Sequence, residues 1–361
     1  MNILNIYRVI FLFLIILFFF EDKVMKLKKG YKLLKFISII ILILLVGLRE
    51  NIDRDSKMYI NIFNNCPSIL EINLEYFKSV RFEYGYIILN SFIKLFTENY
   101  NYIFFIVALI SFFNLYIFIN YFSHSFFYPL VLYYSRWMFL REFTQIRNGL
   151  GYSFFLIALI YIHKNRIRKA IFIILLGGAF HKSIYFCLTF IVFKYLLDKK
   201  IIKEWFLMIL IYIFPFIDLK KWLNVIFINL LGNNYIIRGY VLGKYSTNET
   251  DIFVYYSLVF LIILLVFNKK IIKRDNRKTY KLLKNSYLYS IFIMTLFFDY
   301  GDLRGRLSSF FNTEFVLQER IYSLIKNKLV VKIILVIYLI LIYYIVFARR
   351  YEQEYLPYFN I

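Results

Sequence analysis

The sequence is poor in the residue types from which metal centres and disulfide frameworks are built. Its 361 residues include two cysteines, three histidines and four prolines. Cys66 and Cys187 stand far apart without a partner spacing, so neither a structural zinc site nor a disulfide framework is indicated. Carboxylates with metal-ligand spacing are not visible either, and we expect no metal and no cofactor.

Hydrophobic residues, in contrast, make up 61% of the chain, more than a soluble domain buries around one core. The apolar runs are continuous, which excludes the alternating pattern of a membrane barrel. A spanning helix needs roughly 20 mostly apolar residues. The runs therefore predict an all-α, polytopic integral membrane protein, with residues 1–361 forming one domain of about nine to twelve transmembrane helices. Residues 307–325 are interpreted as one of these spans, and the first run as a retained anchor, because no small-residue cleavage site follows it.

Basic residues outnumber acidic ones by 45 to 22. Short cytoplasmic loops collect lysine and arginine, so the basic segments predict which loops face the cytoplasm. They are Lys23 to Lys35, His163 to Lys169, Lys199 to Lys203, Lys269 to Lys284 and Lys326 to Lys328. Both termini then lie outside, as do two long loops, 49–101 and 218–251. The first loop contains an amphipathic stretch from Tyr84 to Phe96, which is predicted to lie flat at the membrane interface. The basic loop 268–285 is interpreted as cytoplasmic rather than as a nucleic-acid site, and no nucleic-acid partner is expected.

The segment from Gly177 to Ser183 decides the topology downstream. Gly177-Gly178 before His181-Lys182-Ser183 predicts a broken or re-entrant hairpin between two short apolar runs. The alternative is a single long, tilted helix, which inverts every later crossing.

Arginine, unlike lysine, gathers where the predicted spans meet the outer surface. A guanidinium can form two parallel hydrogen bonds with a phosphate or carboxylate, so an arginine set outside predicts an anionic ligand there. The set comprises Arg49, Arg136, Arg141, Arg147, Arg304 and Arg306. If 141–152 is helical, Arg141, Gln145, Asn148 and Tyr152 form one polar stripe that should face a cavity. The alternative for any single arginine is snorkelling to lipid headgroups.

Four short motifs resemble, in order and spacing, those of the EpsG family of exopolysaccharide proteins, which is related to Wzy-type polymerases. The resemblance covers roughly residues 33–197, with Asp53 where the family usually has glycine and Asn148 where it has glutamine. Arg306 with the following Leu-Ser-Ser-Phe-Phe is a looser fifth match. The four motifs are Gly47-Leu48-Arg49 followed by Asp55 and Tyr59; Glu83, Gly85-Tyr86 and Leu89-Asn90; Ile146-Arg147-Asn148-Gly149; and Phe180-His181-Lys182-Ser183.

The resemblance implies a metal-independent, glycosyltransferase-type polymerase in the bacterial cytoplasmic (inner) membrane. Such a protein joins repeat units carried on polyprenyl pyrophosphate into exopolysaccharide, O-antigen or capsule at the outer face. The implied partners are the polyprenyl-pyrophosphate-linked oligosaccharide, membrane lipid, and chain-length regulator and flippase proteins. The candidate bases are Asp55, Glu83 and His181. The candidate substrate-binding residues are Arg49, Arg147 and Arg306 for the pyrophosphate, with Arg136, Arg141, Arg304, Asn148, Gln145 and Tyr59.

Two other activities, and a purely structural role, stay open at this point. A flippase or transporter of the same lipid-linked oligosaccharide also needs an outward basic cavity, although the internal repeats usual in such proteins are not visible. A membrane O-acetyltransferase modifying surface glycans needs a histidine base on the inner side. His124 and His163 lie there, without a recognisable accompanying arginine or serine pattern. A structural role predicts that the outer arginines are individually dispensable.

Overall fold

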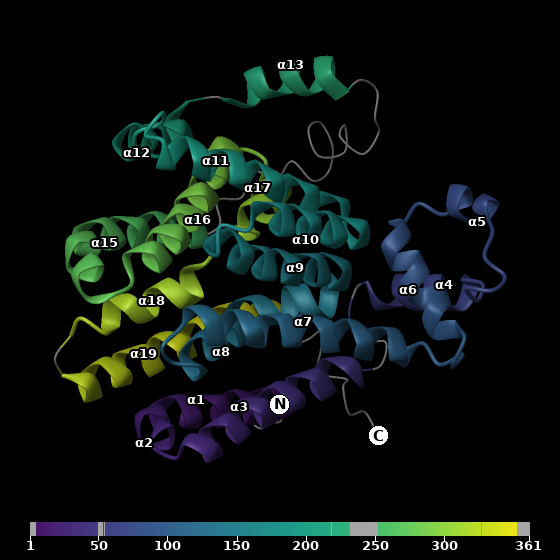
Figure 1. Ribbon diagram of the computed structural model, residues 1–361, viewed down its shortest axis with the longest axis horizontal. Coiled ribbons are helices and arrows are strands. Elements are labelled where there is room, and N and C mark those ends of the chain that lie inside the picture. Colours follow the sequence, from purple (N-terminus) through teal and green to yellow (C-terminus); the bar gives the residue numbers. More distant parts are fainter. Residues whose placement is uncertain are drawn as a thin grey trace. The chain divides into compact units, whose positions relative to one another are not determined.

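The computed structural model describes residues 5–49, 53, 55–217, 219–231, 252–325 and 327–351, and every regular element in these ranges is helical. The predicted all-α class is therefore confirmed. Four helices are long and apolar enough to cross a membrane, as expected for a polytopic membrane protein: Lys28–Gly47, Asn101–Phe122, Val254–Arg274 and Lys328–Phe347. Two compact units emerge, residues 1–185 with 325–361 and residues 186–324 (Figure 1). The single-domain organisation stays a prediction.

Unit 1 contains the N-terminal helices and the C-terminal pair. Its elements are α1 (Ile6–Phe19), α2 (Glu21–Met25), α3 (Lys28–Gly47), α4 (Ser56–Asn65), α5 (Leu74–Ser79), α6 (Tyr84–Lys94), α7 (Asn101–Phe122), α8 (Phe127–Tyr133), the π-helix η1 (Tyr134–Thr144), α9 (Ile146–His163), α10 (Ile167–Phe180), α19 (Lys328–Tyr343) and the π-helix η4 (Tyr344–Tyr351).

Small residues let the central helices of unit 1 approach closely. A Cβ atom at Gly177 on α10 would lie 2.9 Å from Phe154 Cβ and 3.1 Å from the Gly151 carbonyl oxygen on α9. Helices α9 and α10 therefore touch almost backbone to backbone, as small residues allow in membrane helix pairs. Helix α7 packs against α9 on another side, and α3 packs on α7 (Figure 1).

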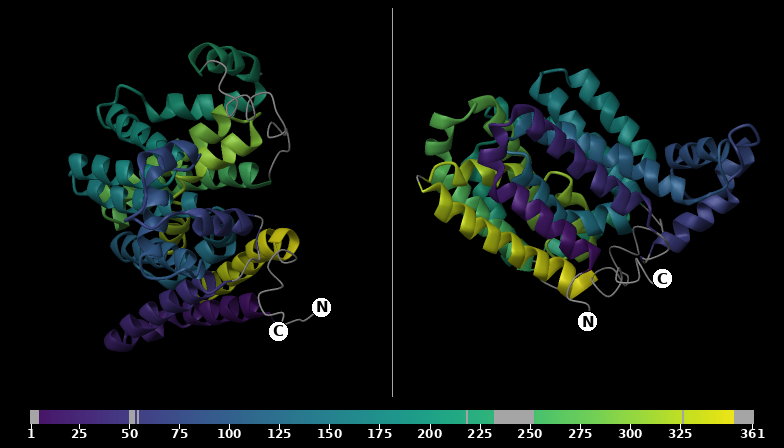
Figure 2. Two further views of the ribbon diagram at one scale, coloured as in Figure 1. Left: turned by 90° about the vertical axis from the view of Figure 1, so that its right-hand side faces the viewer. Right: turned by 90° about the horizontal axis from the view of Figure 1, so that it is seen from below.

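Aromatic side chains join the two ends of the chain within unit 1. Phe11 on α1 stacks on Tyr343 of α19, with ring centroids 4.1 Å apart, and Phe139 on η1 lies 4.3 Å from Phe347 on η4. Figure 2 shows α1 and α19 side by side. Aromatic pairs of this kind add roughly 0.5–1.5 kcal/mol each beyond their buried area, so the C-terminal pair is an integral part of unit 1.

The predicted outer loop 49–101 is largely helical, since it contains α4, α5 and α6. The predicted amphipathic stretch from Tyr84 to Phe96 is confirmed as a helix over Tyr84–Lys94. Its inner face packs into a hydrophobic core that includes Tyr59, Tyr86, Phe104, Ile146 and Leu150. This core supports the surface on which the polar residues of the second, third and fourth motifs meet.

The backbone changes conformation at His181, so a single helix through this region is excluded. Helix α10 ends at Phe180, His181 is extended (φ −153°, ψ 114°), and a 3₁₀ helix, η2 (Lys182–Cys187), follows. The Tyr185 ring lies against Gly178, where an added Cβ would come within 2.1 Å of it. The chain therefore folds back onto the end of α10 at the predicted break.

Unit 2 contains α11 (Leu188–Asp198), α12 (Glu204–Ile213), the 3₁₀ helix η3 (Phe214–Phe216), α13 (Leu219–Leu231), α15 (Ile252–Arg274), α16 (Arg277–Leu296), α17 (Gly301–Ser309) and α18 (Glu314–Tyr322). The prediction of one span over 307–325 is wrong, because α17 ends and α18 begins inside it. Asn312 Oδ1 accepts a hydrogen bond from the Glu314 amide at 2.9 Å, and Thr313 Oγ1 donates to the Leu283 carbonyl at 2.8 Å. These side-chain hydrogen bonds stabilise the break between α17 and α18 in place of a continuous helix. Of the predicted second outer loop, residues 218 and 232–251 lie outside the described residues.

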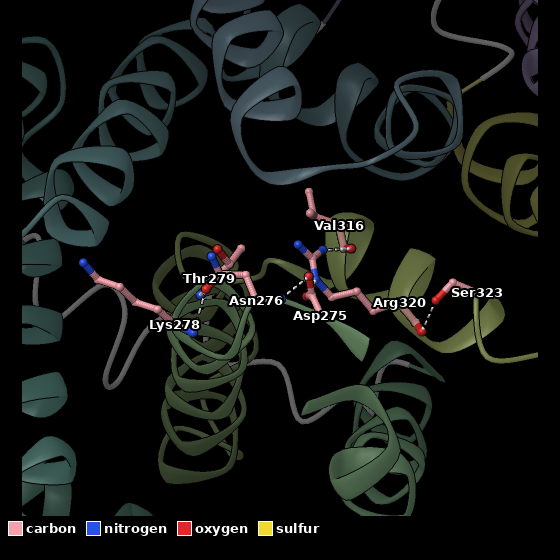
Figure 3. A network of polar contacts seen from close by, with 7 residues as sticks. All are labelled: Asp275, Asn276, Lys278, Thr279, Val316, Arg320 and Ser323. Carbon is pink, nitrogen blue, oxygen red and sulfur yellow. Dashed lines mark hydrogen bonds and ion pairs between the residues drawn. The ribbon is translucent and has the colours of Figure 1, made fainter. Parts of the chain in front are cut away.

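A buried ion pair fastens the turn between α15 and α16 to α18 (Figure 3). Arg320 Nε lies 2.5 Å from Asp275 Oδ2, and Arg320 Nη1 donates to the Val316 carbonyl at 2.8 Å. Asn276 caps α16 by accepting hydrogen bonds from the amides of Lys278 and Thr279. Arg320 thus links the turn in the basic segment 268–285 to α18, and Arg274 adds a hydrogen bond to the Ser323 carbonyl at 3.3 Å.

We expect Arg320→Ala to destabilise the protein strongly, because it leaves the buried Asp275 carboxylate without its cation. Removing one partner of a buried pair costs about 3–5 kcal/mol. Lys281→Ala is the matched control: Lys281 pairs with Asp198 at 2.7 Å, but these side chains are 46% and 33% exposed, and such pairs contribute about 0–1 kcal/mol. Unfolding of the purified protein by SDS titration in mixed micelles measures both. Equal losses in the two variants contradict the prediction.

Candidate functional site

Arg147 stands in the first turn of α9, immediately after the chain reverses at Gln145. Its side chain is 16% exposed, and Nη1 donates to Glu83 Oε2 in an ion pair. The guanidinium carbon lies 4.7 Å from the ring centroid of Phe82, 5.8 Å from that of Tyr86 and 5.9 Å from that of Tyr59. Aromatic rings at these distances attract a cation. The Arg147 guanidinium is therefore held by the Glu83 carboxylate and by cation–π contacts with the surrounding rings.

Glu83 connects Arg147 to the end of α10. Its Oε1 accepts a hydrogen bond from the Lys182 amide at 3.2 Å and lies 3.3 Å from His181 Nδ1. Glu83 is 64 residues from Arg147 and 99 from Lys182 in sequence. Together with Tyr59, whose ring centroid lies 5.9 Å from the Arg147 guanidinium carbon, these residues form what we call the Arg147 cluster: Tyr59, Glu83, Arg147, His181 and Lys182. Parts of all four sequence motifs meet there.

The surroundings of Glu83 keep it ionised. Burial of the carboxyl group opposes ionisation, but the neighbouring His181 imidazole, the charge of Arg147 and the Lys182 amide outweigh it and lower the Glu83 pKa to about 2. Tyr59 behaves oppositely, since burial raises the pKa of its hydroxyl to about 12 and keeps it neutral. Glu83 is therefore a permanent anion near neutral pH and a weak base.

Glycines set the close contacts that assemble the cluster. A Cβ atom at Gly85 would lie 2.7 Å from the Ala179 carbonyl oxygen, so the start of α6 touches the end of α10. A Cβ atom at Gly149 would lie 2.5 Å from the Arg141 carbonyl oxygen, because η1 and α9 form a tight hairpin around Gln145. Any side chain at Gly85 would push Glu83 away from His181.

The prediction of one continuous helix with a polar stripe over residues 141–152 is wrong, because the chain forms a hairpin there. Gln145 has φ −103° and ψ 55°, outside the helical region, so i, i+4 spacing does not carry across it. Arg141 and Tyr152 still meet, with the guanidinium carbon 3.5 Å from the ring centroid, but they do so across the hairpin.

Arg49 lies close to this site but is completely buried. It forms an ion pair with Asp53 at 3.5 Å, with both side chains 0% exposed, and Nη1 donates to the Glu142 carbonyl at 2.7 Å. Its guanidinium also faces the Phe104 ring at 4.4 Å. The Asp53 carboxylate in turn accepts hydrogen bonds from the amides of Asp55 and Ser56 at the start of α4. Arg49 therefore fixes the entry to α4, and its role in binding pyrophosphate stays a prediction.

The remaining predicted residues are divided between the two units. Arg136 and Arg141 are buried on η1, with their guanidinium carbons 5.0 and 4.5 Å from the Trp137 ring centroid. Arg304 and Arg306 stand on α17 in unit 2, where Arg304 Nη1 donates to the Phe298 carbonyl at 2.7 Å. Three other predicted residues are not members of the Arg147 cluster. Asn148 is buried on α9, whereas Gln145 and Asp55 are half-buried at helix ends.

Sequence reasoning assigned no role to three residues that the structure places here. Tyr86 lines the Arg147 cluster, and Lys182 contributes its backbone amide. Both lie inside quoted motifs, so the motifs themselves were the available signal. Glu142, buried on η1, accepts a hydrogen bond from the Tyr133 hydroxyl at 2.6 Å. The only sequence signal for Glu142 was the presence of a carboxylate next to Arg141 in an apolar run.

Comparison with known proteins gives one assignment. No curated protein and no solved structure matches the chain. The model of the EpsG family matches residues 32–360, nearly the whole sequence and all the motifs that meet in the Arg147 cluster. The chain therefore belongs to the EpsG family, which makes it a membrane protein of polysaccharide biosynthesis.

Proposed function

We propose that this protein polymerises oligosaccharide repeat units carried on polyprenyl pyrophosphate, at the outer face of the bacterial cytoplasmic membrane. The single observation that carries the proposal is the convergence of Tyr59, Glu83, Arg147 and His181 from four separate segments. A charged cluster at the outer end of membrane helices is costly unless it has a function.

The reaction needs positive charge where the leaving group departs. The acceptor hydroxyl attacks the anomeric carbon of the lipid-linked chain, and the bond from that carbon to the pyrophosphate oxygen breaks with both electrons passing to the pyrophosphate. Arg147, held by Glu83, supplies fixed positive charge at this position, and Lys182, whose backbone amide bonds to Glu83, adds an exposed cation nearby. Arg147 Nε, Tyr86 Oη and Ser183 Oγ are among the buried side-chain donors that have no hydrogen-bond partner within the part of the chain that the structure describes. Such donors suit a site that receives an anion.

Among the candidate bases, His181 suits proton removal best. Glu83, with a pKa of about 2, is too weak a base to take a proton from a hydroxyl group near pH 7. Its carboxylate lies next to His181 Nδ1, and this favours a proton on that nitrogen. Nε2 is then the basic nitrogen that takes the proton of the acceptor hydroxyl. Glu83 serves as the positioning residue for both His181 and Arg147.

Deletion of the gene tests the proposal against its main alternative, a flippase for the same lipid-linked oligosaccharide. We expect single repeat units on the lipid carrier to accumulate at the outer face, where a membrane-impermeant glycosidase reaches them. Repeats that accumulate protected on the inner face indicate a flippase instead. Long polymer of unchanged amount and length rules out both activities, and unchanged polymer lacking only acetyl groups identifies an O-acetyltransferase.

A further inference from the structure

Two exposed apolar stripes in unit 1 converge beside the Arg147 cluster. On α6, Tyr84, Ile88 and Phe92 are exposed at i, i+4 and i+8, so they share one helix face. On α10, the exposed residues Phe172, Leu175 and Leu176 share a face with Ala179. These stripes are defined here as the α6 stripe and the α10 stripe.

The two stripes meet at the contact between α6 and α10. Gly85, which adjoins the α6 stripe, packs on Ala179 at the end of the α10 stripe. Glu83 precedes Tyr84 directly, and His181 follows α10. The charged cluster therefore occupies the corner at which the two apolar surfaces join. In Figure 1, α6 runs across the direction of α9 and α10 near their ends.

We propose that this corner binds the polyprenyl pyrophosphate carrier, with its prenyl chain lying along the α10 and α6 stripes. The inference rests on the proposed function and adds where the carrier's tail is held. Charge complementarity favours the polyprenyl pyrophosphate over an ordinary bilayer lipid in contact with these helices. The pyrophosphate carries several negative charges, and Arg147 and Lys182 stand at the meeting point, with Glu83 as the single carboxylate among the five cluster residues.

The dimensions of the stripes suit a long, narrow apolar chain. Helix α10 has 14 residues and α6 has 11, which correspond to roughly 21 and 16 Å of helix at 1.5 Å per residue. The α10 stripe leads away from the cluster along α10, whereas the α6 stripe carries no charged side chain at its three exposed positions. A prenyl chain anchored at its pyrophosphate can remain in contact with apolar surface along either path.

A photoactivatable prenyl diphosphate, a farnesyl diphosphate analogue bearing benzophenone, tests the site on the full protein in nanodiscs of phosphatidylethanolamine and phosphatidylglycerol. We expect cross-links to map to 84–96 and 167–180. Ile88→Gln should raise the half-saturating probe concentration about tenfold, or about 1.4 kcal/mol, because it replaces part of the apolar contact with a polar amide. Ile333→Gln is the matched control, because both isoleucines are 46% exposed in unit 1; we expect it to leave labelling unchanged.

Competition separates the carrier from bulk lipid. Unlabelled polyprenyl pyrophosphate should displace the probe, whereas added phosphatidylglycerol should not. Equal displacement by both, or equal labelling of Ile88→Gln and Ile333→Gln, shows that the stripes are only bilayer contacts and overturns the site. If labelling behaves as expected but gene deletion leaves polymer intact, the docking site stands and the polymerase function fails. If deletion stops polymerisation and labelling lies elsewhere, only the docking site fails.

Discussion

Replacement of Arg147 by alanine is expected to abolish long surface polymer while single repeats on the lipid carrier accumulate. The reason is electrostatic: negative charge develops on the departing pyrophosphate, and the guanidinium is the cation fixed at the centre of the cluster. Loss of one preorganised donor to a developing anion typically lowers the rate by about 10²- to 10³-fold. Gel analysis of surface glycan, with mass spectrometry of lipid-linked repeats, measures both effects.

The same substitution leaves Glu83 without its cation, so a folding defect must be distinguished from a catalytic one. In Arg147→Ala/Glu83→Gln the unpaired charge is removed as well, and we expect protein levels to recover while polymer remains absent. Arg147→Lys keeps the charge but loses the planar fork, so partial activity is expected. Full polymer in the double variant shows that the cluster is structural only.

His181→Gln carries the second large effect. With His181 as the base, we expect the polymerisation rate to fall about 10²- to 10⁴-fold. In the native protein the rate should decline towards acid pH, because only the neutral form of an imidazole accepts a proton. The residual rate of His181→Gln should lack this decline. Turnover of purified lipid-linked repeats in nanodiscs between pH 5 and 8 provides the measurement.

Glu83→Gln is the control for this prediction. The folded pKa of Glu83 lies below its ordinary value of 4.5, so its ionisation stabilises the fold fully above pH 4.5, and this contribution is lost as the pH falls towards about 2. Glu83 cannot cause a pH dependence in the range assayed. We expect Glu83→Gln to lower the rate and to keep the acid decline. Persistence of that decline in His181→Gln assigns the base elsewhere, with Asp55 as the next candidate.

Much of the architecture was accessible from sequence because its signals are local. Continuous apolar runs predict the helical class, Gly177 to Ser183 predicts the break at His181, and the amphipathic pattern predicts α6. Local signals failed where tertiary packing decides. The run 307–325 was predicted as one span, although Asn312, Thr313 and Glu314 interrupt it. These polar residues were the available sign of the break, whereas the bond from Thr313 to the carbonyl of Leu283 on α16 forms only in the packed protein.

The sequence predicted which residues belong to the site but not how they are arranged. The motifs identified Arg147, Glu83 and His181 separately, while nothing in the sequence indicates that Glu83 joins the other two across 64 or more residues. The burial of Arg49 was equally hidden, because its partner Asp53 stood out as a departure from the family pattern rather than as a counter-ion. Ion pairs are formed by side chains that meet only after the helices have packed, so residue spacing does not encode them.

The aromatic junction of α1, η1, α19 and η4 has a consequence for how the protein is made. Helices α19 and η4 belong to unit 1, whereas residues 186–324 form unit 2. The ribosome therefore completes unit 2 before it synthesises the last two helices of unit 1. At about 5–20 residues per second, translation of the intervening stretch takes roughly 7 to 28 s. For that time Phe11 and Phe139 face lipid or a chaperone instead of Tyr343 and Phe347. Biogenesis therefore ends with a late docking event, which an arrest sequence placed before α19 would trap.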